Sequence, residues 1–342
     1  MSNPQRLRLS LLLLLIIALL GVTGCLAHPS GLVAPMQAYL PDPTPLPWPA
    51  RIVTPTPFRP LQPTGTWMPT PTFTPTVTPS PTPTPLPSLA ELYSRRLNVL
   101  LLGSDQRPWE IGFRTDTILL VSYNPDTGAT SLISFPRDLY VDIPGVGPNR
   151  INTAMFYGGF STLAATLEQH FGVRPQYYVL IKRGQFKAIV ETLGGVDIQA
   201  ARMYCDYYND GRWVCVGPGP VHLDADMALW YARARKNSND LDRNRRQQEV
   251  VLGLMERVLS LDGLRRAPEL YAQLRGLVTE TNIGLNDILA WLPHMQQFDP
   301  NQVYRYPMTR AQVIPWTTPG GGQVLLPNGP AIEALLRAAA QD

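Results

Sequence analysis

Residues 117–135 read T-I-L-L-V-S-Y-N-P-D-T-G-A-T-S-L-I-S-F, and this stretch decides the fold class. Two apolar arms, residues 117–123 and 130–135, flank the sequence N-P-D-T-G at residues 124–128. Asparagine, proline, aspartate and glycine favour a turn for separate stereochemical reasons, so the stretch predicts a β-hairpin. The central sheet therefore contains antiparallel pairing.

Strands and helices alternate on both sides of this hairpin. Residues 97–103 and 177–181 are short apolar runs that predict buried strands, and residues 140–143 are expected to extend the second hairpin arm. Apolar periodicity and flanking turn residues predict helices at residues 161–171, 185–193, 224–231, 242–261 and 331–339. Together these elements predict a three-layer α/β/α domain around a mixed central sheet.

The N-terminus has the pattern of an export signal. Arg6 and Arg8 precede an apolar run at residues 9–20, and V-T-G-C at residues 22–25 resembles a bacterial lipobox. Residues 1–24 are thus predicted to be a lipoprotein signal peptide, and Cys25 the lipidated residue. The alternative is an uncleaved anchor, because a helix of ~20 residues spans a bilayer. Both alternatives place the rest of the chain at the outer face of the cytoplasmic membrane.

A proline-rich segment separates this anchor from the folded part. Residues 35–87 contain 18 of the chain's 36 prolines, many in Thr-Pro repeats. Such a composition cannot bury a core and favours extended polyproline II. Residues 25–88 are predicted to be a disordered stalk, residues 89–342 the folded domain, and the part from about residue 262 a looser tail.

Composition and missing motifs exclude several functional classes. Without residues 1–24 the chain has 27 basic and 26 acidic residues, so a general nucleic-acid-binding surface is not indicated. The sequence has no G-x-S-x-G, H-E-x-x-H or Walker loop, which argues against serine hydrolases, zinc proteases and P-loop NTPases. Cys205 and Cys215 flank the turn sequence N-D-G, and in an oxidising compartment they predict a disulfide across a hairpin.

A basic cluster lies in the stretch W-Y-A-R-A-R-K-N-S-N-D-L-D-R-N-R-R-Q-Q-E, residues 230–249. Arg243, Arg246 and Gln247 have the i, i+3, i+4 spacing of one helix face, and Val250 and Leu254 continue that face with apolar side chains. Arginines at a helix N-terminus favour phosphate, so the stretch predicts a phosphate clamp beside an apolar wall. The alternative is a solvated basic face on an ordinary amphipathic helix.

Acids and arginines also follow the predicted strand ends. Asp105 comes directly after the first strand, and Asp116 just before the second. If these strands are antiparallel neighbours, the two carboxylates converge and suit a Mg²⁺ ion bound to diphosphate. The alternative is a set of surface salt bridges, each worth under about 1 kcal/mol.

Several motifs in register give the sequence a family resemblance. They are L-L-L-G-S-D (100–105), R-T-D-T-I (114–118), S-F-P-R-D (134–138), I-P-G (143–145), R-I-N-T-A (150–154), G-G (158–159), L-G-G-V-D (193–197) and Y-A-R-A-R (231–235) with the segment up to Gln247. Residues 97–259 thus resemble the LytR-CpsA-Psr family of extracytoplasmic phosphotransferases. The resemblance implies magnesium-dependent transfer of a phospho-glycopolymer from a polyprenyl diphosphate to cell-wall glycan, with the lipid tail in an apolar channel between sheet and helices.

The resemblance also implies roles for individual residues. Asp105 and Asp116 would bind Mg²⁺, with Mn²⁺ as the alternative ion. The predicted catalytic residues are Arg137, Asp138, Arg233 and Arg235, with Asp138 as the candidate base. The residues predicted to bind the diphosphate head are Arg114, Arg150, Asp240, Arg243, Arg246 and Gln247.

Three departures from the family pattern stand out. A lipobox and stalk replace the usual membrane-spanning anchor, Arg150 replaces a common lysine, and Asp242 stands where glycine is usual, which adds an acid near the phosphates. Two other functions stay open: a pyrophosphatase using the same site, and a non-catalytic lipoprotein that binds polyprenyl phosphate or glycan.

Overall fold

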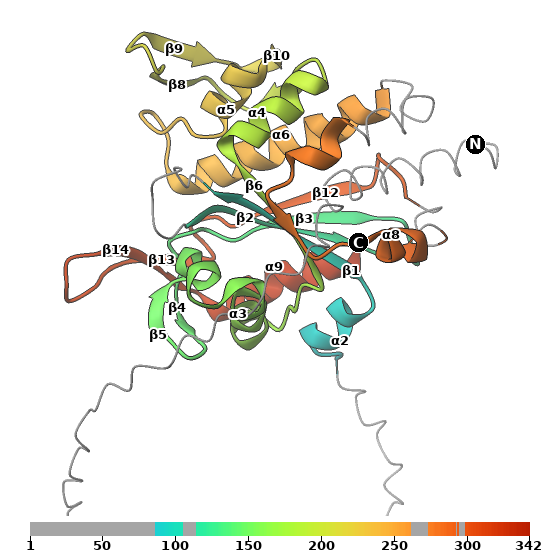
Figure 1. Ribbon diagram of the computed structural model, residues 1–342. Coiled ribbons are helices and arrows are strands. Elements are labelled where there is room, and N and C mark those ends of the chain that lie inside the picture. The colour runs from blue at the N-terminus through green and yellow to red at the C-terminus, as the bar shows by residue number, and fades with distance from the viewer. Residues whose placement is uncertain (1–85, 105–113, 261–272, 292, 294–297) are drawn as a thin grey trace, which may run out of the picture. The chain divides into compact units, whose positions relative to one another are not determined.

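The computed structural model describes residues 86–104, 114–260, 273–291, 293 and 298–342 (Figure 1). The predicted signal peptide, Cys25, the stalk up to residue 85, and Asp105 lie outside the described residues. Within these described ranges, no helix is long and apolar enough to cross a membrane.

The main sheet has six strands in the order β11-β6-β1-β2-β3-β12. Their bounds are β1 Leu97–Ser104, β2 Thr115–Tyr123, β3 Thr130–Ser134, β6 Tyr177–Lys182, β11 Glu280–Thr281 and β12 Val303–Pro307. The predicted hairpin is confirmed, since β2 and β3 are antiparallel from Tyr123↔Thr130 to Leu119↔Ser134. β6 runs parallel to β1 and β12 runs parallel to β3, so the sheet is mixed.

Helices cover both faces of this sheet, which confirms the three-layer architecture (Figure 1). The alternating side chains of β1 divide between two cores. Leu100 and Leu102 belong to the core beneath α3 (Ala154–Phe171) and α9 (Gly329–Gln341). Val99 belongs to a second core, which includes Met255 of the long helix α6 (Asp240–Ser260). The short helix α2 (Leu89–Ser94) packs against α9.

Helix α6 is fixed to the elements beside it in two ways. The buried Gln248 side chain donates hydrogen bonds from Nε2 to Leu132 O at 3.0 Å and Ser134 Oγ at 2.8 Å. Gly253 allows α6 to approach β7 (Val196–Ala200) closely, because a Cβ there would lie 2.2 Å from the carbonyl oxygen of Asp197. α4 (Arg183–Thr192) and α5 (Ala225–Tyr231) lie on the same side of the sheet as α6 (Figure 1).

The structure corrects the prediction that residues 140–143 extend the hairpin. β4 (Tyr140–Ile143) instead pairs with β5 (Gly147–Arg150) in a separate two-stranded sheet. Phe135 donates the last ladder hydrogen bond to Ile118, and Pro136, which has no N–H, follows it and opens a turn to Leu139. A further hairpin, β13 (Val313–Thr317) and β14 (Gln323–Pro327), joins this unit through a bridge between Leu139 and Leu325.

Two other expectations differ from the structure. The segment after residue 262, expected to be looser, supplies β11, β12 and α9, and is thus part of the sheet and the core. Pro307, Pro315 and Pro327 of this segment lie within the short strands β12, β13 and β14. Helix α3 begins seven residues before the predicted Ser161, with a break at Gly158 and Gly159, where Gly159 has φ +65°.

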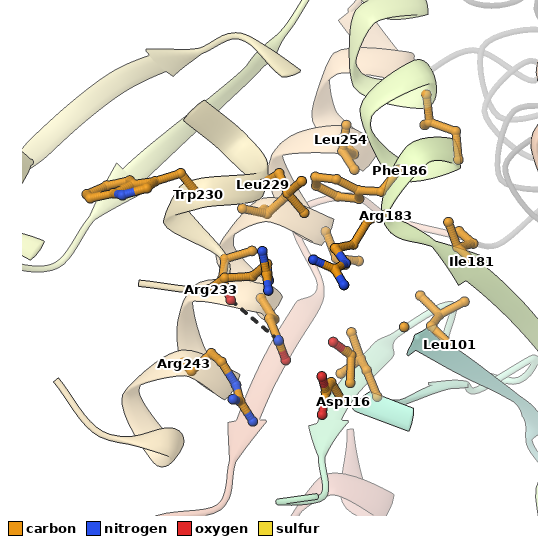
Figure 2. A pocket seen from close by; sticks show the side chains of 18 of the residues that line it. Leu101, Asp116, Ile181, Arg183, Phe186, Leu229, Trp230, Arg233, Arg243 and Leu254 are labelled. Carbon is orange, nitrogen blue, oxygen red and sulfur yellow. Dashed lines mark hydrogen bonds between the residues drawn. The ribbon is translucent and has the colours of Figure 1, made fainter. Parts of the chain in front are cut away.

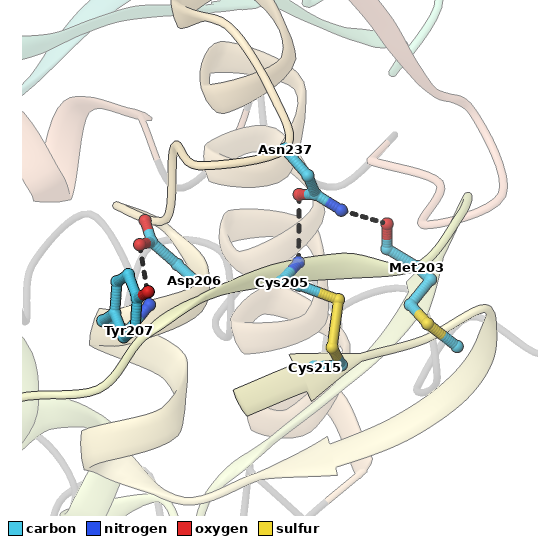
Figure 3. Close-up of a disulfide and its surroundings, with 6 residues drawn as sticks. All are labelled: Met203, Cys205, Asp206, Tyr207, Cys215 and Asn237. Carbon is cyan, nitrogen blue, oxygen red and sulfur yellow. Dashed lines mark hydrogen bonds between the residues drawn. A yellow bond between two sulfur atoms is a disulfide. The ribbon is translucent and has the colours of Figure 1, made fainter. Parts of the chain in front are cut away.

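A small subdomain extends from the α4–α6 side. β7 pairs with β10 (Gly219–Leu223), and β8 (Tyr204–Tyr207) pairs with β9 (Trp213–Val216). Cys205 and Cys215 are directly opposed in the β8–β9 hairpin and form a disulfide (Figure 3). This covalent link fixes a hairpin that contacts the loop after α5.

Candidate functional site

A cavity of about 540 Å³ lies between the central sheet and helices α4, α5 and α6 (Figure 2). Six cationic side chains and three carboxylates contribute to its lining, together with a larger number of apolar side chains. Figure 2 shows Arg183, Arg243 and Asp116 directed toward a common space that Phe186, Leu229 and Leu254 border. The cavity therefore combines a charged region with an apolar one.

The apolar part is formed by three helices and the sheet. Val250, Leu254 and Val258 lie four residues apart along α6, so they present one continuous face to the cavity. This bears out the predicted apolar continuation of the α6 face. The remaining apolar lining residues are Leu101, Leu102, Leu119, Ile181, Phe186, Ile189, Leu193, Leu229, Trp230, Ala232, Ala234, Val251, Met255 and Leu274.

The charged end is organised around Arg137, which follows β3. Its Nη1 atom lies 2.6 Å from Asp116 Oδ1, and its Nε atom lies 3.3 Å from Asp240 Oδ2 and 3.4 Å from Asp138 Oδ2. The Arg137 guanidinium thus brings together residues that are far apart in the sequence. They come from the start of β2, the end of β3 and the start of α6. Six predicted site residues line the cavity: Asp116, Arg137, Arg233, Arg235, Arg243 and Gln247.

Asp240 links three arginines. Its Oδ1 atom lies 2.9 Å from Arg235 Nη2 and 3.4 Å from Arg243 Nη1, while its Oδ2 atom contacts Arg137. Burial disfavours the charged carboxylate, but the positive charges of Arg243, Arg235 and Arg137 outweigh burial and hold the pKa of Asp240 below its ordinary value. Asp240 is therefore ionised and orients the arginines.

The pKa of Asp138 shifts in the opposite direction from that of Asp240. Burial, and then its hydrogen bond with Asp240, raise the pKa of Asp138 above its ordinary value despite the nearby Arg137 and Arg150. Burial also lowers the pKa of Arg243 to about 10, so that guanidinium stays charged at neutral pH. Two neighbouring carboxyl groups whose pKa values move apart have the pattern of a site that exchanges protons.

The ends of β1 and β2 meet as the sequence predicts. Ser104, the last residue of β1, is paired with Thr115, the residue before Asp116. Asp105 follows Ser104 directly but lies outside the described residues. Among the residues that are described, no group of three or more His, Cys, Asp or Glu side chains could hold a metal. One carboxylate next to serine and threonine hydroxyls suits Mg²⁺, which completes its coordination with phosphate oxygens and water, better than Zn²⁺.

Sequence reasoning missed two cations of the cavity, Lys182 and Arg183. Lys182 ends β6 and is paired with Ser104 of the parallel strand β1, so the carboxyl ends of both strands meet at the cavity. The sequence contained a pattern that could have identified these two cavity residues. Lys182 and Arg183 directly follow a predicted apolar strand, as Asp105 does. Only the parallel pairing of β6 with β1 brings the two strand ends together.

Arg246 is a correction to the predicted diphosphate site. Its side chain is fully buried, donates from Nη2 to Ala234 O, and stacks 4.6 Å from the Tyr204 ring centroid and 5.6 Å from that of Tyr231. Successive helix residues are rotated by ~100°, so Arg246 lies roughly 60° from Arg243 and faces α5 and β8 rather than the cavity. In this structure the Arg246 guanidinium is therefore not part of the cavity lining.

Four more predicted site residues lie outside the cavity lining: Asp138, Asp240, Arg150 and Arg114. Arg150 contacts Asp138, with Nε and Oδ1 3.3 Å apart, and donates from Nη2 to Gln323 O at 2.8 Å. Arg114 is exposed immediately before β2. Asp242, the departure from the family pattern, pairs with Arg202 at 2.9 Å and Arg245 at 3.4 Å, so its charge is balanced away from the cavity.

The disulfide-linked hairpin positions Arg235. Asp206 Oδ2 on β8 accepts hydrogen bonds from the backbone N–H groups of Arg235 at 2.5 Å and Lys236 at 3.3 Å. Asn237 accepts from Cys205 N at 3.0 Å and donates to Met203 O at 3.2 Å (Figure 3). The loop that carries Arg235 is thus anchored to the hairpin at three consecutive residues.

Comparisons with known proteins agree on one family. The model of the LytR_cpsA_psr family matches residues 80–332. The polyisoprenyl-teichoic acid–peptidoglycan teichoic acid transferase TagU of Bacillus cereus is 30% identical over 232 residues, 67% of this chain and 71% of that protein.

Solved structures show the same fold. The crystal structure of B. subtilis TagV has a TM-score of 0.60 at 23% identity and covers 72% of this chain and 96% of that chain. A LytR-CPS2A-psr family protein, TagT, solved with bound octaprenyl pyrophosphate lipid, has a TM-score of 0.53 at 23% identity and covers 73% of this chain and 91% of that chain.

Proposed function

This chain is a member of the LytR-CpsA-Psr family, and from that premise we propose that it is a phosphotransferase that moves a phospho-glycopolymer from a polyprenyl diphosphate carrier to cell-wall glycan. One observation carries the proposal: the apolar cavity lined by α4, α5 and α6 runs into a cluster of arginines. A single ligand class matches both parts, a long apolar chain that ends in a diphosphate. The named activity of the TagU relative supports the same assignment.

The charged end would hold the diphosphate. Arg137, Arg233, Arg235 and Arg243 line it, and guanidinium groups bind phosphate oxygens in a bidentate manner. Gln247 is held in place because its Nε2 atom donates to Ala232 O at 3.5 Å. The polyprenyl tail would occupy the apolar wall along α6, where each buried methylene contributes about 0.8 kcal/mol.

The transfer is a displacement at the phosphorus that bears the polymer. The acceptor hydroxyl oxygen forms the new bond to phosphorus, the bond to the bridging oxygen breaks, and polyprenyl phosphate leaves. Arg137 and Arg243 neutralise the charge that develops on the phosphate oxygens. Asp138 takes the hydroxyl proton, since its raised pKa makes it the more basic of the two neighbouring carboxyl groups.

A Mg²⁺ ion, or Mn²⁺, is part of the proposal. Asp116 and Asp105 would hold it at the adjoining ends of β1 and β2. Bound there, the ion would supply positive charge to the diphosphate bridge. Arg137, 2.6 Å from Asp116 Oδ1, would orient that carboxylate.

The proposal includes attachment to the outer face of the cytoplasmic membrane through Cys25 and a stalk over residues 25–88. The composition of the segment and its lipobox support this. Mass spectrometry of the mature N-terminus tests it: an acylated N-terminal Cys25 is expected, and an unacylated chain that starts elsewhere would contradict it.

The activity is tested with the full chain in detergent, a polyprenyl-diphosphate-linked glycopolymer, and a soluble peptidoglycan oligosaccharide, with Mg²⁺ or with EDTA. Polymer joined to the oligosaccharide through phosphate, only with Mg²⁺, is the expected product. Free polymer phosphate would identify a hydrolase, and bound lipid without turnover a binding protein. Asp116→Asn is expected to lower turnover by at least about 100-fold, and undiminished turnover would refute the metal assignment.

A further inference from the structure

A pair of aromatic side chains, one from the β4–β5 hairpin and one from the β13–β14 hairpin, is partly exposed on the side of the sheet away from the apolar cavity (Figure 1). The rings of Tyr140, on β4, and Trp316, on β13, have centroids 5.7 Å apart at an interplanar angle of 51°. Trp316 is 39% exposed and Tyr140 is half-buried. Large exposed apolar side chains gathered on one surface indicate a binding surface.

The surface formed by Tyr140 and Trp316 is connected to the charged end of the site through side-chain and backbone contacts. Tyr140 is the direct cross-strand partner of Arg150, so the two side chains share one face of the β4–β5 hairpin. Arg150 contacts Asp138 and donates to Gln323 O on β14, and Leu325 N donates to Asp138 O at 2.9 Å. A continuous set of contacts therefore runs from Trp316 through Tyr140 and Arg150 to the candidate base.

This surface and the apolar cavity lie on opposite sides of the central sheet. The apolar cavity is on the α6 side of the sheet, whereas Val141 and Ile143 of β4 pack in the core beneath α3. Figure 1 shows the β4–β5 and β13–β14 hairpins on the side of α3, away from α4, α5 and α6. In phosphoryl transfer the attacking and leaving oxygens are roughly in line. If the lipid leaves toward α6, the acceptor hydroxyl enters from the side of these hairpins.

We propose that Tyr140, Trp316 and Arg150 form an acceptor subsite that binds a pyranose ring of the wall glycan and presents its hydroxyl to Asp138. This subsite deepens, and rests on, the proposed transferase function. The apolar C–H face of a pyranose stacks on the negative face of an aromatic ring, and the guanidinium donates hydrogen bonds to sugar hydroxyls. Tyr140 and Trp316 supply rigid ring surface, and Arg150 connects the bound sugar to the base.

The β8–β9 hairpin provides a matched control. Trp213 is 53% exposed, and its ring lies 5.0 Å from that of Tyr207, so it is a second exposed Trp–Tyr pair on a hairpin. Trp213→Ala removes the same side chain as Trp316→Ala, and Ile314→Ala removes exposed apolar area from the same hairpin as Trp316 without removing a ring.

The test measures binding of a peptidoglycan tetrasaccharide to the full chain in detergent by calorimetry, and separately the KM values for acceptor and donor. Three variants, Trp316→Ala, Tyr140→Ala and Tyr140→Phe, are compared with the controls Trp213→Ala and Ile314→Ala. Trp316→Ala and Tyr140→Ala are expected to raise the tetrasaccharide Kd and the acceptor KM by about tenfold or more. Tyr140→Phe, Trp213→Ala and Ile314→Ala should stay within about twofold, and the donor KM should not change.

The outcomes separate the subsite from the activity. Tetrasaccharide binding that depends on Trp316, in a chain that transfers nothing, would refute the transferase function and leave the glycan subsite standing. An equal loss in Trp213→Ala, or no loss in Trp316→Ala, would overturn the subsite. The subsite would also be overturned if Trp316→Ala weakened binding to phospholipid vesicles but left tetrasaccharide binding unchanged. That result would mean that the surface contacts the membrane.

Discussion

Replacing Gly253 with alanine tests whether the close fit of α6 against β7 sets the geometry of the site. A Cβ atom at residue 253 would lie 2.2 Å from Asp197 O and 2.8 Å from Val196 Cγ2. Non-bonded contacts to carbon are optimal near ~3.5 Å. The backbone of β7 cannot rotate away as a flexible side chain would, so α6 must move outward by roughly 1 Å to restore that separation.

The size of the effect follows from two opposing contributions. Overpacking costs about 1–3 kcal/mol, while exchanging glycine for alanine within a helix stabilises by up to about 1 kcal/mol. A net loss of up to about 2 kcal/mol in the free energy of unfolding is expected. The same helix carries Arg243, Gln247 and Val250, and a displacement of ~1 Å at a reacting site costs up to about 100-fold in rate.

The assay combines urea unfolding with transfer of the glycopolymer. Gly184→Ala is the control, because Gly184 is also a helical glycine, in α4, and a Cβ there would have no neighbour within 4 Å. The control is expected to be as stable as the parent chain, or more stable by up to about 1 kcal/mol. If Gly253→Ala were as stable and as active as Gly184→Ala, the reasoning about α6 would be refuted.

Three further predictions concern the charged end, the apolar wall and the disulfide. Because Asp138 must be ionised to accept a proton and its pKa is raised, the transfer rate should fall as pH drops through a value above the ordinary 3.8. Asp138→Asn should lower the rate by about 10²- to 10⁴-fold and abolish that acidic limb, whereas an unchanged pH–rate profile would exclude Asp138 as the base. Leu254→Asn should weaken binding of polyprenyl diphosphate by about tenfold and of inorganic diphosphate by less than about twofold, as measured by calorimetry; equal losses would place the tail elsewhere. Replacing Cys205 and Cys215 with serine should lower the free energy of unfolding by about 2–3 kcal/mol, and a reductant should then have no further effect on the double variant.

Sequence reasoning predicted the elements that local patterns specify. The N-P-D-T-G turn specified the β2–β3 hairpin, and the apolar spacing of Val250 and Leu254 specified the cavity face of α6. The convergence of the β1 and β2 ends also followed, because antiparallel neighbours bring the end of one strand to the start of the next.

The remaining features depend on contacts that periodicity does not encode. Arg243 and Arg246 have the spacing of one helix face, yet one lines the cavity and the other is buried against Tyr204, since the ring that receives it lies on a different hairpin. Lys182 became a cavity residue only through the parallel pairing of β6 with β1. Residues 140–143 left the main sheet because Pro136 ends the hydrogen-bonded ladder, an effect that the apolar pattern alone does not reveal.

Asp240 gives the site its own counter-ion. With Asp116 and Asp138 it forms ion pairs with Arg137, Arg235 and Arg243. A diphosphate that binds to these arginines replaces their ion pairs with the carboxylates. Because the arginines are already paired with carboxylates, few small counter-ions are released into solution when the diphosphate binds. Donor binding should accordingly depend only weakly on ionic strength, and selection among anions would rest on the apolar tail rather than on the charge of the head group.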